Sequence, residues 1–195
     1  MSMIGNLARV PEHVRSSLHE DPSKIDALLY PDDADKKPVK KLGFFSRLFG
    51  LKQKPRPISS CAIEPLSAED SVDIDKTWHA LHFLFTGTNW KGDFPEGFLV
   101  SCGKPVGDVD VGYGPARSFT STEVKRISEF LMHVDRDVLR SRLDPEKIER
   151  LEIYWSGDNT HLEEDWAYLE GRLSDLTAFV AETAQKDLAL LVYIS

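Results

Sequence analysis

The chain is 195 residues long, which is enough for one domain whose hydrophobic core needs no disulfide or metal. Hydrophobic residues form 41% and charged residues 29% of the sequence, with a mean hydropathy of −0.32, and these values exclude a disordered, fibrous or low-complexity protein. The 32 acidic residues outnumber the 24 basic ones, so the net charge of −8 argues against nucleic-acid binding by the whole surface.

Two cysteines, Cys61 and Cys102, are too few for a disulfide framework or a four-thiolate zinc site. No stretch approaches the roughly 20 apolar residues that a membrane-spanning helix requires. The first residues, Met1 to Val10, lack the basic region, apolar run and cleavage site of a signal peptide. We therefore expect a cytoplasmic protein with reduced thiols.

The N-terminal third is predicted to contain one strand and two short helices. The strand covers Met3 to Val10 and ends at Pro11. The first helix follows over residues 11–18, and the second covers residues 22–30, where Asp21 can cap the helix.

The segment from Lys36 to Arg56 carries eight basic residues and no acidic one, which leaves 16 basic and 32 acidic residues in the rest of the chain. An apolar run, residues 42–51, lies inside it. We expect an insertion or mobile loop at about 36–56. A peripheral contact of residues 42–51 with an anionic membrane is the less favoured alternative.

A helix ending at Gly87 is predicted over residues 73–87. Its apolar stripe, which should face the core, consists of Ile74, Trp78, Leu81 and Phe85. A polar band beside this stripe consists of Asp75, His79, His82 and Thr86.

The remaining elements are predicted from their apolar pattern and capping residues. A strand is expected at Phe98 to Cys102, a glycine-rich turn at 107–114, and a helix at 120–134 that opens with the capping-box pair Thr120 and Glu123. Asp144 and Pro145 open a short helix, and residues 156–159 form a turn.

The C-terminal part is predicted to hold the longest helix and a buried strand. The helix covers residues 161–186, with Thr160 and Glu163 as a second capping-box pair, and the strand covers Leu188 to Ile194. We expect one α/β or α+β domain with a mixed sheet. The first and last strands belong to this sheet, and the helices at 73–87 and 161–186 flank it.

Three stretches together resemble the YfbM-like family of bacterial proteins of unknown function: residues 1–5, the helix over 73–87, and Gly112 to Arg117. The long last helix and the final strand are also similar. The resemblance implies one compact α/β domain over residues 1–195 and a bacterial cytoplasmic origin, and it supplies no catalytic assignment. The basic segment at 36–56 departs from the shorter members.

The candidate pocket consists of Asp75, Trp78, His79, His82, Thr86, Tyr113 and Arg117. Asp75, one turn before His79, can orient its imidazole, and His79 and His82 are spaced to face one pocket or one metal. The loop before residue 120 could hold an anion with Arg117. The structural alternatives are favoured: histidines satisfied by neighbouring groups, and a turn with Arg117 in a salt bridge.

We assign no catalytic residue, no metal ligand and no cofactor. The favoured function is a non-enzymatic binding or interaction module with a protein partner, such as an immunity-type protein that neutralises a toxin through its acidic surface. The alternative is an enzyme or small-ligand-binding protein with a pocket formed by Asp75, His79, His82, Tyr113 and Arg117. No nucleic-acid partner is expected.

Overall fold

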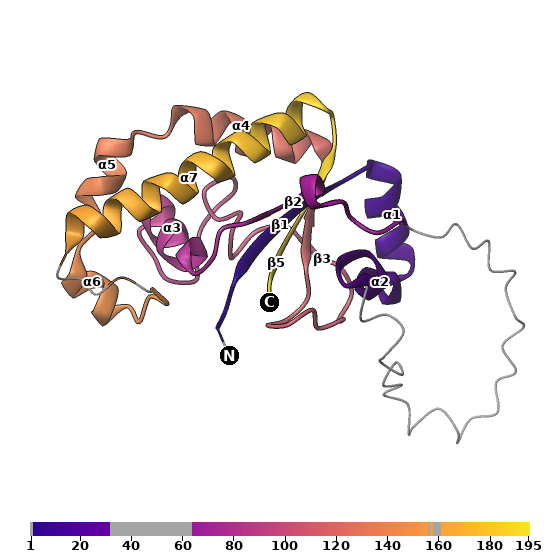
Figure 1. Ribbon diagram of the computed structural model, residues 1–195, viewed down its shortest axis with the longest axis horizontal. Helices are drawn as coiled ribbons and strands as arrows, with labels where there is room; N and C mark the ends of the chain where they lie inside the picture. The colour runs from indigo at the N-terminus through magenta and orange to yellow at the C-terminus, as the bar shows by residue number, and fades with distance from the viewer. Residues whose placement is uncertain (1, 32–63, 156, 158–160) are drawn as a thin grey trace, which may run out of the picture.

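The computed structural model describes residues 2–31, 64–155, 157 and 161–195 and has an α+β fold (Figure 1). One five-stranded sheet has the strand order β2-β1-β5-β4-β3. Its strands are β1 Gly5–Val10, β2 Ser71–Asp73, β3 Lys104–Pro105, β4 Arg117–Phe119 and β5 Ala189–Ile194. Every pairing is antiparallel, so the expectation of a mixed sheet is wrong.

The two longest strands, β1 and β5, lie side by side in the middle of the sheet. They pair from Gly5 with Ile194 to Val10 with Ala189, and almost all of their residues are buried. The continuous apolar run at the C-terminus therefore does mark a strand buried on both faces. Such a run is typical of parallel sheets, but an antiparallel strand needs it equally when helices cover both faces.

Five helices lie on one face of the sheet (Figure 1). They are α3 Thr77–Thr86, α4 Ser121–His133, α5 Arg136–Ser141, α6 Pro145–Arg150 and α7 Leu162–Gln185. Their apolar side chains pack on Leu7, Phe119, Leu190 and Val192 of the sheet. The expected capping box of Thr120 and Glu123 opens α4, which confirms that prediction.

The opposite face is covered by α1 Glu12–Glu20, α2 Ile25–Leu29 and the 3-10 turn η1 Pro22–Lys24 between them. Leu18 and Ile25 pack there on Ala8 and Leu191 of the central strands. The sheet is thus the middle of three layers, and alternate residues of β1 and β5 contribute to two separate cores.

Two local predictions are wrong. The helix predicted over 73–87 begins only at Thr77, because Asp73 belongs to the edge strand β2, which pairs with β1. Residues 98–102 form consecutive turns instead of a strand, because the Gly97 carbonyl accepts hydrogen bonds from three following amides.

Several predictions fall on residues outside the described ranges. These are the basic segment at 36–56 with its apolar run at 42–51, the thiol of Cys61, most of the turn at 156–159 and the capping residue Thr160.

Candidate functional site

The helix α3 is buried on all sides, not on one stripe as the sequence predicts. Nine of its ten residues are buried, and the helix ends, as expected, at Gly87 in the left-handed conformation with φ of 73°. The middle of the polar band therefore does not border solvent, whereas its two ends, Asp75 and Thr86, are partly exposed. His79 and His82 are both fully enclosed, with 0% exposure.

Both ring nitrogens of His79 are bound to backbone groups of two separate loops. The amide of Tyr154 donates to Nδ1 over 2.8 Å, so Nε2 carries the proton, and it donates to the carbonyl of Asn89 over 2.7 Å. Burial lowers the pKa of this imidazole, and the Asn89 carbonyl partly offsets the effect. A neutral His79 is thus a cross-link between loops and has no lone pair left for a metal.

His82 lies one turn further along α3, and neither of its ring nitrogens has a partner with normal hydrogen-bond geometry. The backbone of Lys91 faces the ring, and the charge of Arg117 acts on it. Burial, above all, lowers the pKa of His82 to about 4. His82 is therefore a neutral polar group of the core at pH 7.

Arg117 on β4 donates hydrogen bonds to backbone carbonyls instead of forming the expected salt bridge. Its guanidinium reaches the carbonyl oxygens of Phe98, Leu99 and Cys102. Burial lowers the pKa of Arg117 to about 10. The side chain holds the turns at 98–102 in place, because its guanidinium donates to carbonyls that the amides of a neighbouring strand would otherwise bind.

Asp75 lies before α3 and does not orient the imidazole of His79, whose two ring nitrogens are bound to Asn89 and Tyr154. One carboxylate oxygen of Asp75 accepts a hydrogen bond from the Tyr168 hydroxyl of α7. Its carbonyl accepts a bond from the amide of Gly5 over 2.9 Å. Asp75 therefore ties the start of α3 to α7 and β1.

Trp78 belongs to a group of stacked rings. Its indole lies 4.8 Å from the His79 ring at an interplanar angle of 9°, and Tyr154 stacks at 5.9 Å. Trp90 covers the outer side of His79 at 4.4 Å and is itself 53% exposed. This group closes His79 off from solvent.

The last two candidates, Thr86 and Tyr113, lie apart from these groups. Thr86 donates to the carbonyl of His82 and lines a cavity of about 450 Å³ with Lys91, Asp93 and Glu96. Tyr113 lies in a loop at the end of β5, where its amide donates to the carbonyl of Ile194. The structure brings His79, His82 and Arg117 together inside the core, and it does not join them with Thr86 or Tyr113 in one cavity.

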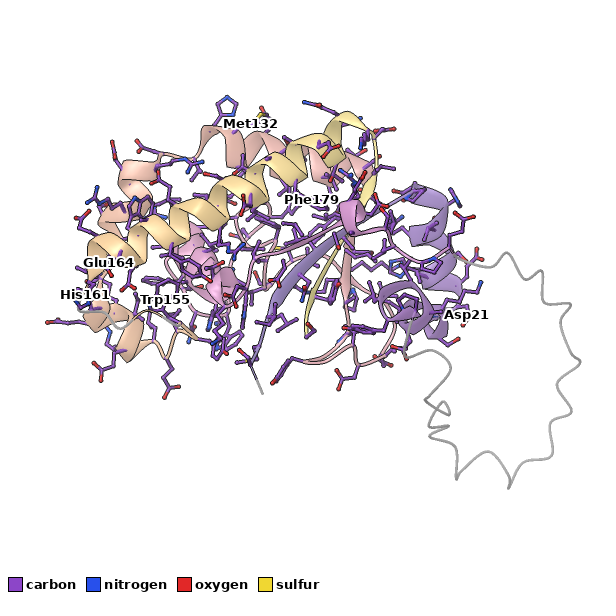
Figure 2. The ribbon with its side chains drawn as sticks, in the orientation of Figure 1. Asp21, Met132, Trp155, His161, Glu164 and Phe179 are labelled. Atoms are coloured by element: carbon purple, nitrogen blue, oxygen red, sulfur yellow. The ribbon has the colours of Figure 1, made fainter. Side chains whose placement is uncertain are left out.

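A larger groove, which the sequence analysis does not identify, lies where β1 ends. Its volume is about 640 Å³, and α1, α2 and residues 64–66 contribute to its walls. Arg9 lies at its edge, with Nε donating to Asp70 and Nη1 2.8 Å from a Glu182 oxygen. The Arg9 guanidinium also lies over the ring of Phe179 on α7, which is labelled in Figure 2. Only the tertiary structure places these distant segments together.

Within the described ranges no three His, Cys, Asp or Glu side chains gather in an arrangement that could hold a metal. None of the helices among the described residues is both long and apolar enough to cross a bilayer.

A model of the "Domain of unknown function (DUF1877)" matches residues 1–193. The chain belongs to the DUF1877 family. A solved structure, that of the protein of unknown function YfbM from Escherichia coli, superposes on this DUF1877 chain with a TM-score of 0.63 at 18% identity. The match covers 98% of this chain and 99% of YfbM, so the resemblance to YfbM-like proteins is confirmed and the two proteins share a fold. Among curated proteins, none matches the chain.

Proposed function

We propose that this DUF1877 protein is a non-enzymatic binding module whose ligand is another protein. The observation that carries the proposal is the use of His79: both of its ring nitrogens are bound to backbone groups, and stacked rings cover it. Arg117 is likewise bound to three backbone carbonyls. General acid–base chemistry needs a group that can exchange a proton with a bound substrate. These side chains instead hold loops to the core.

The outer surface is then the part of the molecule available for function, and it is acidic. The described residues include 28 acidic and 16 basic side chains. One of these basic side chains, Arg117, lies inside the molecule, bound to backbone carbonyls, and does not offset the acidic surface. Such a surface attracts a basic partner and accelerates its association, most strongly at low salt.

An immunity protein, which neutralises a toxin by binding it, is the specific form of this function that we favour. It requires affinity and fast association but no catalytic group. The acidic excess of the described surface would supply the electrostatic attraction.

The test is capture of a partner from the native host with the tagged full-length chain, followed by binding kinetics with the purified partner. We expect one partner whose association rate falls about tenfold as the salt concentration rises from low to physiological values. Absence of any specific partner, together with turnover of a small molecule by the purified chain, would refute the proposal.

A further inference from the structure

The groove at the end of β1 has an apolar floor that no described segment covers. Val10 and Leu28 form the buried base, and Val14 and Leu66 form partly exposed walls. A volume of about 640 Å³ lies within the range of pockets that hold a small ligand or a few side chains of a peptide. An apolar hollow of this size on a binding module indicates a place where side chains of a partner can be buried.

The charges at the groove favour a cationic partner. Arg9 is neutralised by Asp70 and Glu182. Glu64, by contrast, is exposed at the rim and makes no hydrogen bond or ion pair within the described residues. Lys24 donates to Ser17 Oγ on the α1 wall over 3.1 Å and keeps its positive charge there. Glu64 is the carboxylate at the rim that stays available to a ligand, and the acidic excess of the described surface acts in the same direction.

Arg9 is held inside the wall of the groove by the carboxylates of Asp70 and Glu182 and is not exposed to a ligand. Its Nη1 is 2.8 Å from a Glu182 oxygen but lacks the geometry of a hydrogen bond, and the side chain is almost completely buried.

We propose that this groove is the docking site for a short basic and apolar segment of a partner protein. Leucine or phenylalanine side chains occupy the floor formed by Val10 and Leu28, and a neighbouring lysine or arginine pairs with Glu64. The inference rests on the proposed function, because it names the surface and the partner chemistry of the binding module.

The probe is a fluorescent synthetic peptide of about ten residues that combines leucine, phenylalanine and lysine. The control peptide has the same sequence with glutamate in place of each lysine. We expect the full-length chain to bind the lysine peptide at least about tenfold more tightly than the glutamate peptide, with a loss of affinity at high salt. Equal affinity for both peptides, or binding of neither, would overturn the proposal.

Two adjacent residues of α1 provide a matched pair of variants. Ser17 lines the groove, whereas Ser16 is exposed and does not. Ser17→Trp should fill the groove and weaken peptide binding at least about tenfold, and Ser16→Trp should change it less than about twofold. Circular dichroism checks that both variants fold. Equal effects of the two substitutions would place the peptide elsewhere and refute the docking site.

Further variants test the charge and the accessibility of the site. Glu64→Gln should weaken binding of the lysine peptide about threefold. It should leave unchanged the binding of a peptide whose lysines are replaced by uncharged residues. A chain without residues 36–56 should bind the lysine peptide as tightly as the full chain does. Peptide binding that appears only after this deletion would show that residues 36–56 occupy the groove in the full chain, and would overturn the proposal. If a host partner binds the Ser17→Trp variant unchanged, the docking site is refuted while the binding function stands.

Discussion

His79 and His82 lie three residues apart on α3 and have different environments. The first links the backbone at Asn89 to the backbone at Tyr154, and the second is enclosed without a normal hydrogen-bond partner. Both must be neutral in the folded state, because burial penalises the imidazolium. The two histidines therefore contribute to the stability of the fold, and this contribution depends on pH.

Removing the His79 ring nitrogens should destabilise the protein. His79→Phe keeps the stacked ring but leaves the Tyr154 amide and the Asn89 carbonyl without partners, and we expect a loss of about 2 kcal/mol in the free energy of unfolding. Urea denaturation measures it. His133→Phe, at an exposed site on α4, is the control and should cost less than about 0.5 kcal/mol. Equal stability of His79→Phe and the parent chain would contradict the cross-link.

Acid should weaken the fold through His82. Its pKa is about 4 when folded and 6.5 when unfolded, so the unfolded chain binds the proton first. The stabilising contribution is complete above pH 6.5 and is lost as the pH falls towards 4, by about 3 kcal/mol at most. The urea midpoint should therefore fall over this window. His82→Leu should flatten the fall, and an unchanged pH profile in this variant would show that other groups cause it.

At the scale of elements, some contacts between segments that lack regular hydrogen bonding depend on single residues. Arg117 on β4 holds the turns at 98–102, and Gly5 on β1 lets α3 approach closely. A Cβ at residue 5 would lie 2.5 Å from Cβ of Trp78, whereas a Cβ at Gly171 on α7 would meet nothing within 4 Å.

Arg117→Met should leave three backbone carbonyls without their donor. We expect a loss of about 3 kcal/mol in stability, since several buried acceptors lose their partner at once. Hydrogen exchange should accelerate most at the amides of residues 98–102. Arg150→Met, at an exposed position on α6, should alter neither quantity. Exchange that rises uniformly over the chain would argue against a local role.

Two glycine substitutions should change the stability of the protein in opposite directions. Gly5→Ala forces a methyl group against Trp78 and should cost about 1–3 kcal/mol. Gly171→Ala adds a methyl group in open space within a long helix and should stabilise the protein by about 0.5–1 kcal/mol. Thermal unfolding of both variants decides this, and a destabilised Gly171→Ala would refute the second part.

At the scale of the whole molecule, one sheet connects two cores. Leu190 and Leu191 are neighbours on β5, and each is fully buried, the first in the core under α7 and the second in the core under α1. Because the same central strands serve both cores, we expect them to unfold together.

Leu190→Ala and Leu191→Ala test this coupling. Each should cost about 2–4 kcal/mol. Tryptophan fluorescence reports the first core, which includes Trp78 and Trp166, and circular dichroism reports the whole chain. In both variants the two signals should give one midpoint. A Leu191→Ala chain that loses dichroism before fluorescence changes would show two independent units.

Much of the fold follows from local sequence patterns. The apolar run at 188–194, the glycine that ends α3 and the capping box of α4 act through neighbours in the sequence, so they predict their elements well. The strand expected at 98–102 fails because a distant side chain, Arg117, satisfies those carbonyls. An apolar pattern alone cannot distinguish a strand from buried turns.

The sequence by itself determined an acidic domain of helices and strands, its first and last strands, its long helices and its family, because these depend on composition, short-range periodicity and a few spaced motifs. Only the tertiary structure decided that the sheet is antiparallel, that the histidines of α3 are enclosed, and that a groove opens where β1 ends. Each of these depends on contacts between segments far apart in the chain. Whether a polar side chain binds a ligand or a backbone group is set by what the fold brings to it.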